Sequence, residues 1–251
     1  GQVGGLGVDA QSGLGHATHT GDGALAVGAV LEVDRQGLAD LGVLDGPAGD
    51  VALGLEDLRV AVSWLDDADP GVRARSAEAA AAFPNRSEIE VPLMPVNIDP
   101  AFQREVADVH RDLFAEHADR YGDNVRRKVE RALAVTDEAY EASVAARERY
   151  RDEAAEALDG FDLLLVPTIG CVAPRRTIPE RDLRPRILRF TEPFNVLGRP
   201  ALALPFGSAE DGLPASVSLV GRTGEDALVL GAGLALERYA GTRARPRTAS
   251  S

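Results

Sequence analysis

The chain reads Gly160-Phe161-Asp162-Leu163-Leu164-Leu165-Val166-Pro167-Thr168, where four large aliphatic residues follow one another between turn-forming residues. An uninterrupted apolar run of this kind is typical of a strand that is buried on both faces, whereas a half-buried strand alternates apolar and polar residues. The segment therefore predicts a strand inside a sheet that helices cover on both faces.

Upstream of this strand, the residues predict a strand–helix–strand unit. Residues 58–62 alternate in polarity and predict a strand, and the alanine-rich residues 72–83 predict a helix that Pro84 ends. Residues 88–92 predict a second short strand. Such a unit is the building block of an α/β sheet, so we expect the α/β class, with a mixed β-sheet flanked by helices.

The remaining residues predict helices and strands on either side of the buried strand, with turns marked by glycine and proline. In chain order we expect largely helical structure over 100–158, a loop over 170–188, strands over 201–205 and 215–220 joined by a turn at Asp211-Gly212, and a helix over 225–240 with Gly241 as its C-cap.

The first 54 residues differ in composition from the rest of the chain. They hold 14 of its 26 glycines and one proline. Glycine loses more backbone freedom on ordering than any other residue, so a stretch of this composition folds reluctantly. We expect residues 1–45 to be poorly defined, residues 46–241 to form one domain and residues 242–251 to be a disordered tail.

Charge and composition exclude several classes of protein. The formal net charge is −13, from 40 acidic and 27 basic residues, which gives no electrostatic footprint for nucleic acid or an anionic membrane. No apolar run approaches the ~18 residues of a membrane-spanning helix. Cys171 is the single cysteine and cannot form an internal disulfide, which favours a reduced, cytoplasmic setting.

The histidines and the basic run do not predict a metal or phosphate site. His16 and His19 lack a convincing third ligand nearby, and His110 and His117 lie two helical turns apart, too far for one metal ion. A solvated helix surface explains both the second pair and the run Arg126-Arg127-Lys128. We therefore expect no metal and no cofactor.

Six segments form an ordered series along the chain. They are Leu44-Asp45-Gly46, residues 57–62, residues 161–168 ending in Pro-Thr, residues 190–205 with Phe-Thr, Phe-Asn and Gly-Arg-Pro-Ala, residues 211–222 with Asp-Gly-Leu-Pro and Leu-Val-Gly-Arg, and residues 225–237. No single segment is specific, but the ordered set over about residues 40–240 resembles the amidase signature family of carbon–nitrogen hydrolases. The resemblance implies an α/β/α sandwich, present here in part.

The resemblance also implies a chemistry that this sequence does not supply. Related enzymes use a Ser–cis-Ser–Lys triad, in which a neutral lysine takes a proton through one serine while the other attacks the amide carbonyl. Backbone amides of a Gly/Ser-rich loop stabilise the oxyanion. Lys128 is the only lysine, and Ser250-Ser251 is the only pair of adjacent serines. Both lie after the region where the nucleophile belongs, so we expect no catalytic residue in this chain.

Two further expectations concern the start of the chain. It begins at Gly1 rather than at methionine, which a processed chain or a fragment explains, and we expect a C-terminal fragment of an amidase that is inactive alone. Residues 1–40 do not align with the family. Divergence and out-of-frame translation of GC-rich DNA are the two explanations that stay open.

The resemblance implies that five residues near strand ends form walls of a substrate pocket: Thr168, Cys171, Thr191, Phe194 and Asn195. Each has a structural alternative. Asn195 would cap a turn, Phe194 would belong to the core, and Thr191 would be a helix N-cap. Cys171 as a nucleophile would need a histidine, and none is near it in the sequence.

The function that follows is hydrolysis of a carboxylic amide to an acid and ammonia or an amine, with a small-molecule amide as the partner. The alternatives are an amidotransferase A-type subunit acting on misacylated tRNA, a non-catalytic binding or scaffold protein that keeps the amidase shell, and an unrelated α/β protein. The absent triad residues favour the scaffold, and truncation explains the same absence. The sequence identifies neither the amide nor the oligomeric state.

Overall fold

Strand β3 is the middle strand of a five-stranded sheet in the computed structural model, which describes residues 53–95 and 98–244. The strand order is β2-β1-β3-β5-β4; β1 is parallel to β2 and β3, and β5 is antiparallel to β3 and β4. The strands are β1 (Val60–Val62), β2 (Arg86–Glu88), β3 (Leu163–Pro167), β4 (Ala201–Ser208) and β5 (Pro214–Val220).

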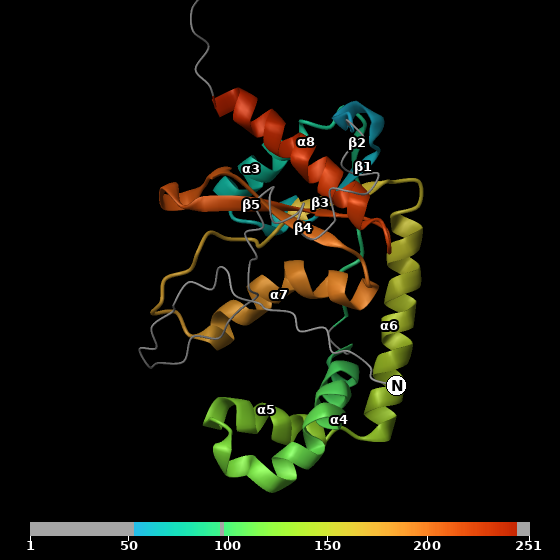
Figure 1. Ribbon diagram of the computed structural model, residues 1–251, viewed down its shortest axis with the longest axis vertical. Helices are drawn as coiled ribbons and strands as arrows, with labels where there is room; N and C mark the ends of the chain where they lie inside the picture. Colours follow the sequence, from blue (N-terminus) through green and yellow to red (C-terminus); the bar gives the residue numbers. More distant parts are fainter. Residues whose placement is uncertain (1–52, 96–97, 245–251) are drawn as a thin grey trace, which may run out of the picture.

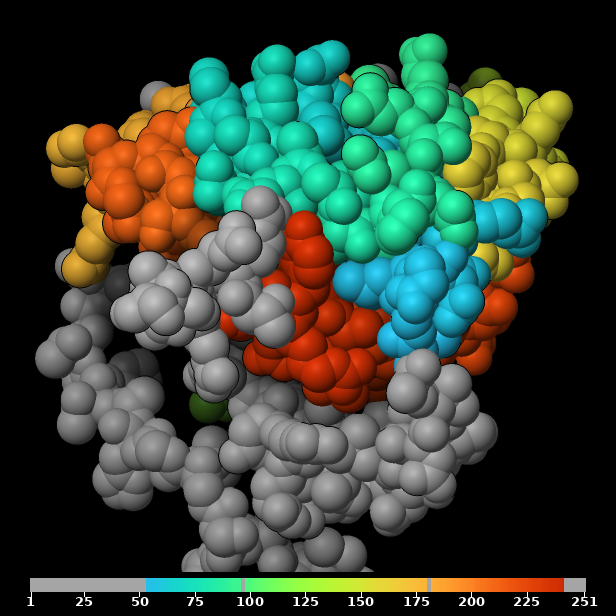
Figure 2. Space-filling model, turned by 90° about the horizontal axis from the view of Figure 1, so that it is seen from above, coloured from blue at the N-terminus to red at the C-terminus, as the bar shows by residue number. Residues whose placement is uncertain are grey.

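Helices cover both faces of the sheet (Figure 1). They are α3 (Pro70–Ala80), α4 (Asp99–His117), α5 (Asp123–Leu133), α6 (Asp137–Ala157), α7 (Glu180–Leu197) and α8 (Asp226–Ala244), with short 3₁₀ turns η1 (Leu55–Asp57), η2 (Leu65–Asp67), η4 (Ala118–Arg120) and η5 (Glu210–Gly212). Helices α3 and α8 lie on one face and α7 on the other, while α4 and α5 extend away from the sheet. Seen from above, the red surface of α8 adjoins the teal surface of the segment that contains α3 (Figure 2).

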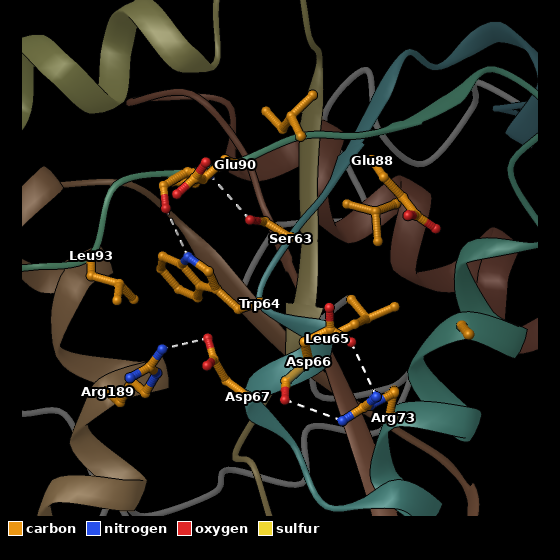
Figure 3. Close-up of a pocket in the computed structure, with 14 residues that line it drawn as sticks. Ser63, Trp64, Leu65, Asp66, Asp67, Arg73, Glu88, Glu90, Leu93 and Arg189 are labelled. Atoms are coloured by element: carbon orange, nitrogen blue, oxygen red, sulfur yellow. Dashed lines mark hydrogen bonds and ion pairs between the residues drawn. The ribbon is translucent and has the colours of Figure 1, made fainter.

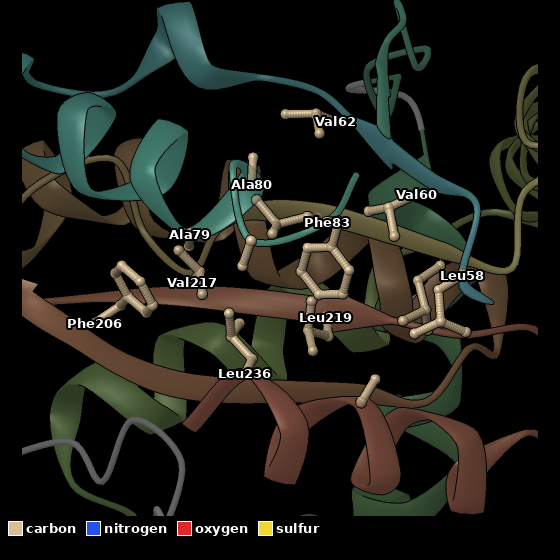
Figure 4. Close-up of a cluster of buried hydrophobic side chains, with 14 of the residues drawn as sticks. Leu58, Val60, Val62, Ala79, Ala80, Phe83, Phe206, Val217, Leu219 and Leu236 are labelled. Atoms are coloured by element: carbon tan, nitrogen blue, oxygen red, sulfur yellow. The ribbon is translucent and has the colours of Figure 1, made fainter. Parts of the chain in front are cut away.

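The side chains of β3 divide between the two faces, as the uninterrupted apolar run predicts. Leu163 and Leu165 belong to the buried cluster on the α3 and α8 face, together with Phe83, Leu219 and Leu236. Figure 4 shows the last three of these side chains within the cluster. All five are 2% exposed or less. Their cluster is the larger of the two that flank the sheet. The prediction of a fully buried strand is confirmed.

The opposite face of the sheet packs against α7. Leu164 and Val166 of β3 belong to a second buried cluster that includes Phe190 and Phe194 of α7. Trp64, which follows β1, packs in the same cluster. Because aromatic rings bury large apolar areas, these three rings contribute strongly to the packing of α7 on the sheet.

Within the helical region, a buried hydroxyl joins α6 to the start of α4. Ser143 of α6 donates from Oγ to the carbonyl of Ile98 (2.6 Å) and accepts from the N–H of Ala101 (3.0 Å) at the start of α4. Helix α5 packs on α4.

His110 of α4 was predicted on a solvated face; it is instead half-buried, with Nδ1 2.9 Å from the hydroxyl of Tyr121.

Some predicted boundaries differ from the structure. Strand β2 lies at Arg86–Glu88, earlier than predicted, because Ser63 and Trp64 bind the backbone of Val91 and draw that segment out of the sheet. Helix α8 runs on to Ala244 because Gly241 stays helical instead of acting as a C-cap. The predicted stretch 1–45, with His16 and His19, lies outside the described residues, as do residues 245–251 of the predicted tail 242–251. Residues 242–244 of that tail are helical and belong to α8.

The predicted loop over 170–188 is helical in its last part, because α7 begins at Glu180 and continues through Pro185 and Pro193. An interior proline costs a helix about 3 kcal/mol. Phe190 and Phe194 are buried, and burial of a large apolar side chain contributes about 1.5–3 kcal/mol. Their burial offsets the cost of the interior prolines. Gly198, with φ 63°, ends the helix.

We predict that Leu165→Ala lowers the free energy of unfolding by about 2–5 kcal/mol, because it leaves a cavity in the centre of the sheet. The measurement is urea unfolding followed by far-UV circular dichroism. Val109→Ala on α4, where the side chain is 77% exposed, should change the free energy by less than about 0.5 kcal/mol. If both substitutions changed the free energy of unfolding equally, the inference that β3 lies in the centre of the core would be contradicted.

Asp162, just before β3, ties three segments together at the amino end of the parallel strands. Its carboxylate accepts from the backbone N–H of Arg59 (2.8 Å) and lies 3.4 Å from the guanidinium groups of both Arg59 and Arg222. Burial alone would raise the pKa of Asp162. The hydrogen bonds and charge of Arg59, with the charge of Arg222, outweigh burial and hold that pKa below its ordinary value.

A lowered pKa in the folded state means that Asp162 stabilises the fold above its unfolded pKa, and that this contribution is lost as pH falls through the folded pKa. Asp162→Asn should therefore destabilise the protein at pH 7 and flatten the loss of stability on acidification. Urea midpoints measured from pH 7 to pH 3 test this. Asp108→Asn, on an exposed carboxylate of α4, is the control and should leave the profile unchanged.

Candidate functional site

The carboxyl ends of β1, β2 and β3 meet at one edge of the sheet, because these three strands are parallel. The segments that follow them are residues 63–69, 89–93 and 168–171. In open α/β sheets, ligands bind in the crevice outside the carboxyl ends of the strands. We therefore expect a ligand-binding site at this edge, which we call the carboxyl edge.

A groove of about 740 Å³ opens along the carboxyl edge (Figure 3). Its walls come from the end of β1, from η2 and α3, from the segment after β2, and from Arg189 of α7. Val62, Leu65, Ile89 and Leu93 make the groove partly apolar. A groove with apolar walls and a few polar groups suits a small organic ligand.

Trp64 fixes the shape of this groove. Its indole Nε1–H donates to the carbonyl of Val91 (3.0 Å), and Ser63 Oγ accepts from the N–H of the same residue (3.2 Å). The ring stacks on Phe194, with centroids 5.8 Å apart, and meets Phe190 edge-on. The backbone of Trp64 is left-handed, at φ 59°, which costs about 1–3 kcal/mol and persists only where its surroundings hold it.

The groove carries more acidic than basic groups. Asp66, Asp67, Glu88 and Glu90 line it, against Arg73 and Arg189. Both guanidinium groups are already neutralised, since Arg73 lies 3.1 Å from Asp66 and Arg189 lies 2.5 Å from Asp67. The uncompensated charges are the exposed carboxylates, so the groove favours a neutral or basic ligand over an anion.

A smaller hollow of about 270 Å³ adjoins the groove, because Asp67 and Arg189 line both. Gly170, after β3, lies in its wall. A Cβ atom there would be 2.6 Å from the ring of Phe190 and 3.1 Å from the carbonyl of Asp67, so only glycine fits. Arg186 closes the side of the hollow and pairs with Asp69 at 2.8 Å.

The structure places the predicted residues Thr168 and Cys171 at the carboxyl edge. Thr168 Oγ1 accepts from Ser218 Oγ (3.1 Å). Cys171 is buried, and burial raises the pKa of its thiol; Arg186 opposes this rise, and Asp69 adds to it. A buried thiol with a raised pKa stays protonated and is a poor nucleophile, consistent with the exclusion of Cys171 as catalytic.

The other three predicted residues lie on α7. Phe194 is in the core and supports Trp64 from behind. Thr191 is not a helix N-cap: it lies inside α7, where Oγ1 donates to the carbonyl of Ile187 (3.3 Å). Asn195 is exposed in the last turn, and its carbonyl accepts from Gly198 N–H (3.3 Å). Among the described residues, none of the five predicted positions lines the groove or the smaller hollow.

Sequence reasoning missed the residues that shape the groove. Neither Trp64 nor the acidic pair Asp66 and Asp67 is among the site residues that the sequence predicts. One signal was available, since the single tryptophan is the second residue after a predicted strand. Arg189 had no such signal, because its partner Asp67 is more than one hundred residues away in the chain.

We predict that Trp64→Phe lowers the free energy of unfolding by about 1–3 kcal/mol, because the ring still stacks but the carbonyl of Val91 loses its donor. Urea unfolding followed by far-UV circular dichroism measures the change. Tyr140→Phe, in a half-exposed ring on α6, is the control and should change the free energy by less than about 0.5 kcal/mol. Unchanged stability in Trp64→Phe would show that the indole does not hold the groove.

Comparisons with known proteins agree on one group. The family model described as Amidase matches residues 55–230. The putative amidase AmiD of Mycobacterium tuberculosis is 29% identical over 146 residues, which are 56% of this chain and 31% of that protein. An amidase of Pseudomonas putida is 30% identical over 222 residues, 80% of this chain and 47% of that protein.

Solved structures agree with these sequence matches. A structure described as a crystal structure of amidase has a TM-score of 0.66 and 30% identity, and the match covers 75% of this chain and 47% of that chain. The chain thus spans about a third to a half of the length of the relatives it matches.

Proposed function

This chain belongs to the amidase family, and from that premise we propose that it forms the substrate-binding part of an enzyme that hydrolyses carboxylic amides to an acid and ammonia or an amine. The observation that carries the proposal is the groove at the carboxyl edge, where α/β enzymes bind their ligands. A cytoplasmic setting belongs to the same proposal. Within residues 53–95 and 98–244, no helix is long and apolar enough to cross a membrane.

We further propose that the catalytic serines and lysine come from polypeptide outside these 251 residues, so that this chain alone is inactive. Ser250 and Ser251 are the only adjacent serines, and Lys128 is the only lysine. Lys128 lies on α5, which packs on α4 and extends away from the sheet (Figure 1). A lysine there cannot take a proton from a nucleophile at the carboxyl edge.

The loop after β3 and α7 complete the proposed pocket. Thr168 and Cys171 lie in that loop, and Phe194 supports the Trp64 wall, so these residues shape the pocket without touching its groove. Thr191 and Asn195 stay predictions as substrate-binding residues. The net charge of −13 favours hydrolysis of a free amide over action on tRNA, because a tRNA-binding protein needs a basic surface.

The carboxylates at the groove predict which amides bind. Glu88 and Glu90 are exposed, and no arginine pairs with them in the described residues. Two unit charges about 4 Å apart in water interact by about 1 kcal/mol, or about fivefold in binding. Three amides of matched length separate the effect of charge from that of size: 6-aminohexanamide, hexanamide and adipamic acid.

The test is a fusion of the part of the Pseudomonas putida amidase that lies outside its match with this chain to residues 53–251 of this chain. We expect the fusion to release ammonia from hexanamide and 6-aminohexanamide, with kcat/KM at least fivefold lower for adipamic acid. Glu88→Gln with Glu90→Gln should remove most of that difference. Asp108→Asn on α4 is the matched control and should leave it unchanged.

Two results would contradict the proposed function. One is a folded fusion that hydrolyses none of the three amides. The other is ammonia release by the unfused chain that survives Lys128→Ala after contaminating enzymes are excluded.

A further inference from the structure

We propose that the ion pair between Asp67 and Arg189 forms the end wall of the groove and thereby determines how long an acyl chain the site accepts. The smaller hollow lies beyond this wall and receives the far end of a longer chain once the pair is removed. The inference rests on the proposed function and deepens it, because it names the two residues that select among neutral amides by length.

The two cavities meet at this pair. Asp67 and Arg189 line both the groove of about 740 Å³ and the hollow of about 270 Å³, and no other described residue lines both. Figure 3 shows the two side chains pointing toward each other beside Trp64. Their carboxylate and guanidinium groups are 2.5 Å apart, so no ligand chain passes between them. The pair is therefore a wall shared by the two cavities.

The wall is held by little besides the pair itself. The Nε–H of Arg189 is buried and has no acceptor among the described residues, so the position of the guanidinium depends on Asp67. The two side chains are 37% and 33% exposed, and exposed ion pairs contribute little to stability. Removing both side chains should therefore open the wall without unfolding the chain.

The hollow beyond the wall suits an apolar chain end. Gly170, Pro185 and Phe190 line it and carry no charge. Arg186 lines its other side, where Asp69 neutralises the guanidinium at 2.8 Å. The N–H of Asp69 also donates to the carbonyl of Gly170 (2.8 Å), which fixes this side of the hollow. An alkyl end is thus a better occupant than a charged one.

This arrangement predicts how affinity depends on chain length. Each methylene group that leaves water for an apolar cavity tightens binding about fourfold. Affinity for linear amides should therefore rise with chain length until the chain reaches Asp67 and Arg189, and then stop rising. Without the pair, the rise should continue into the hollow.

The test measures the dissociation constants of butanamide, hexanamide, octanamide and decanamide for the full 251-residue chain by titration calorimetry. In the unmutated chain we expect the affinity to stop rising at a chain length within this series. Asp67→Ala combined with Arg189→Ala opens the wall and leaves neither charge unpaired. This double variant should raise the affinity for decanamide relative to butanamide at least tenfold.

A second double variant is the matched control. Glu105→Ala combined with Arg147→Ala removes an ion pair of 2.8 Å between α4 and α6, and the Nε–H of Arg147 is likewise buried without an acceptor among the described residues. Neither residue lines the groove or the hollow, so the affinity ratio should change less than twofold. Far-UV circular dichroism checks that both double variants fold. If the first does not, Arg189→Ala alone shortens the wall and tests the same limit.

Three results would overturn this inference and leave the proposed function standing. They are an affinity that keeps rising through decanamide in the unmutated chain, the same limit with and without the pair, and an equally large change in the control. The last would mean that loosened helix packing, and not the wall, sets the limit. If the unmutated chain binds none of the four amides, the groove is not a substrate site, and the proposed function fails together with this inference.

Discussion

Burial of β3 on both faces is the constraint on which the rest of the structure depends. Its four aliphatic side chains alternate between the two faces, so each face needs its own cover. On one side α3 and α8 provide that cover, and on the other side α7 does (Figure 1). A strand with an apolar pattern of this kind cannot lie at an edge or on a solvated face without exposing leucine to water.

The pairing of β3 also determines what lies at each end of the sheet. Its parallel neighbour β1 brings the Trp64 segment and the loop after β3 to the same edge, where the groove forms. Its antiparallel neighbour β5 pairs in turn with β4. Thus one strand, through two kinds of pairing, places the binding groove on one side and the hairpin of β4 and β5 on the other.

The sequence predicted the elements whose signals are local. The run Leu163–Val166 specifies a buried strand by itself, and the hairpin at Asp211-Gly212 follows from its turn residues. Helix α7 was missed because Pro185 and Pro193 argue locally against a helix, while the force that holds it is packing of Phe190 and Phe194 on a distant sheet. The groove was missed for the same reason. Its walls meet only when α7 docks, which no local pattern of residues reveals.

Trp64 has a consequence for how this protein can be observed. It is the only tryptophan in the chain, so all of the tryptophan emission comes from one ring, held between Phe194 and the groove. An indole responds to the polarity around it and to rings that stack on it. A change in the water content of the groove, or in the seating of α7, would therefore shift the emission of the unlabelled protein. The intrinsic fluorescence of Trp64 therefore reports on the groove and on the packing of α7 without any added label.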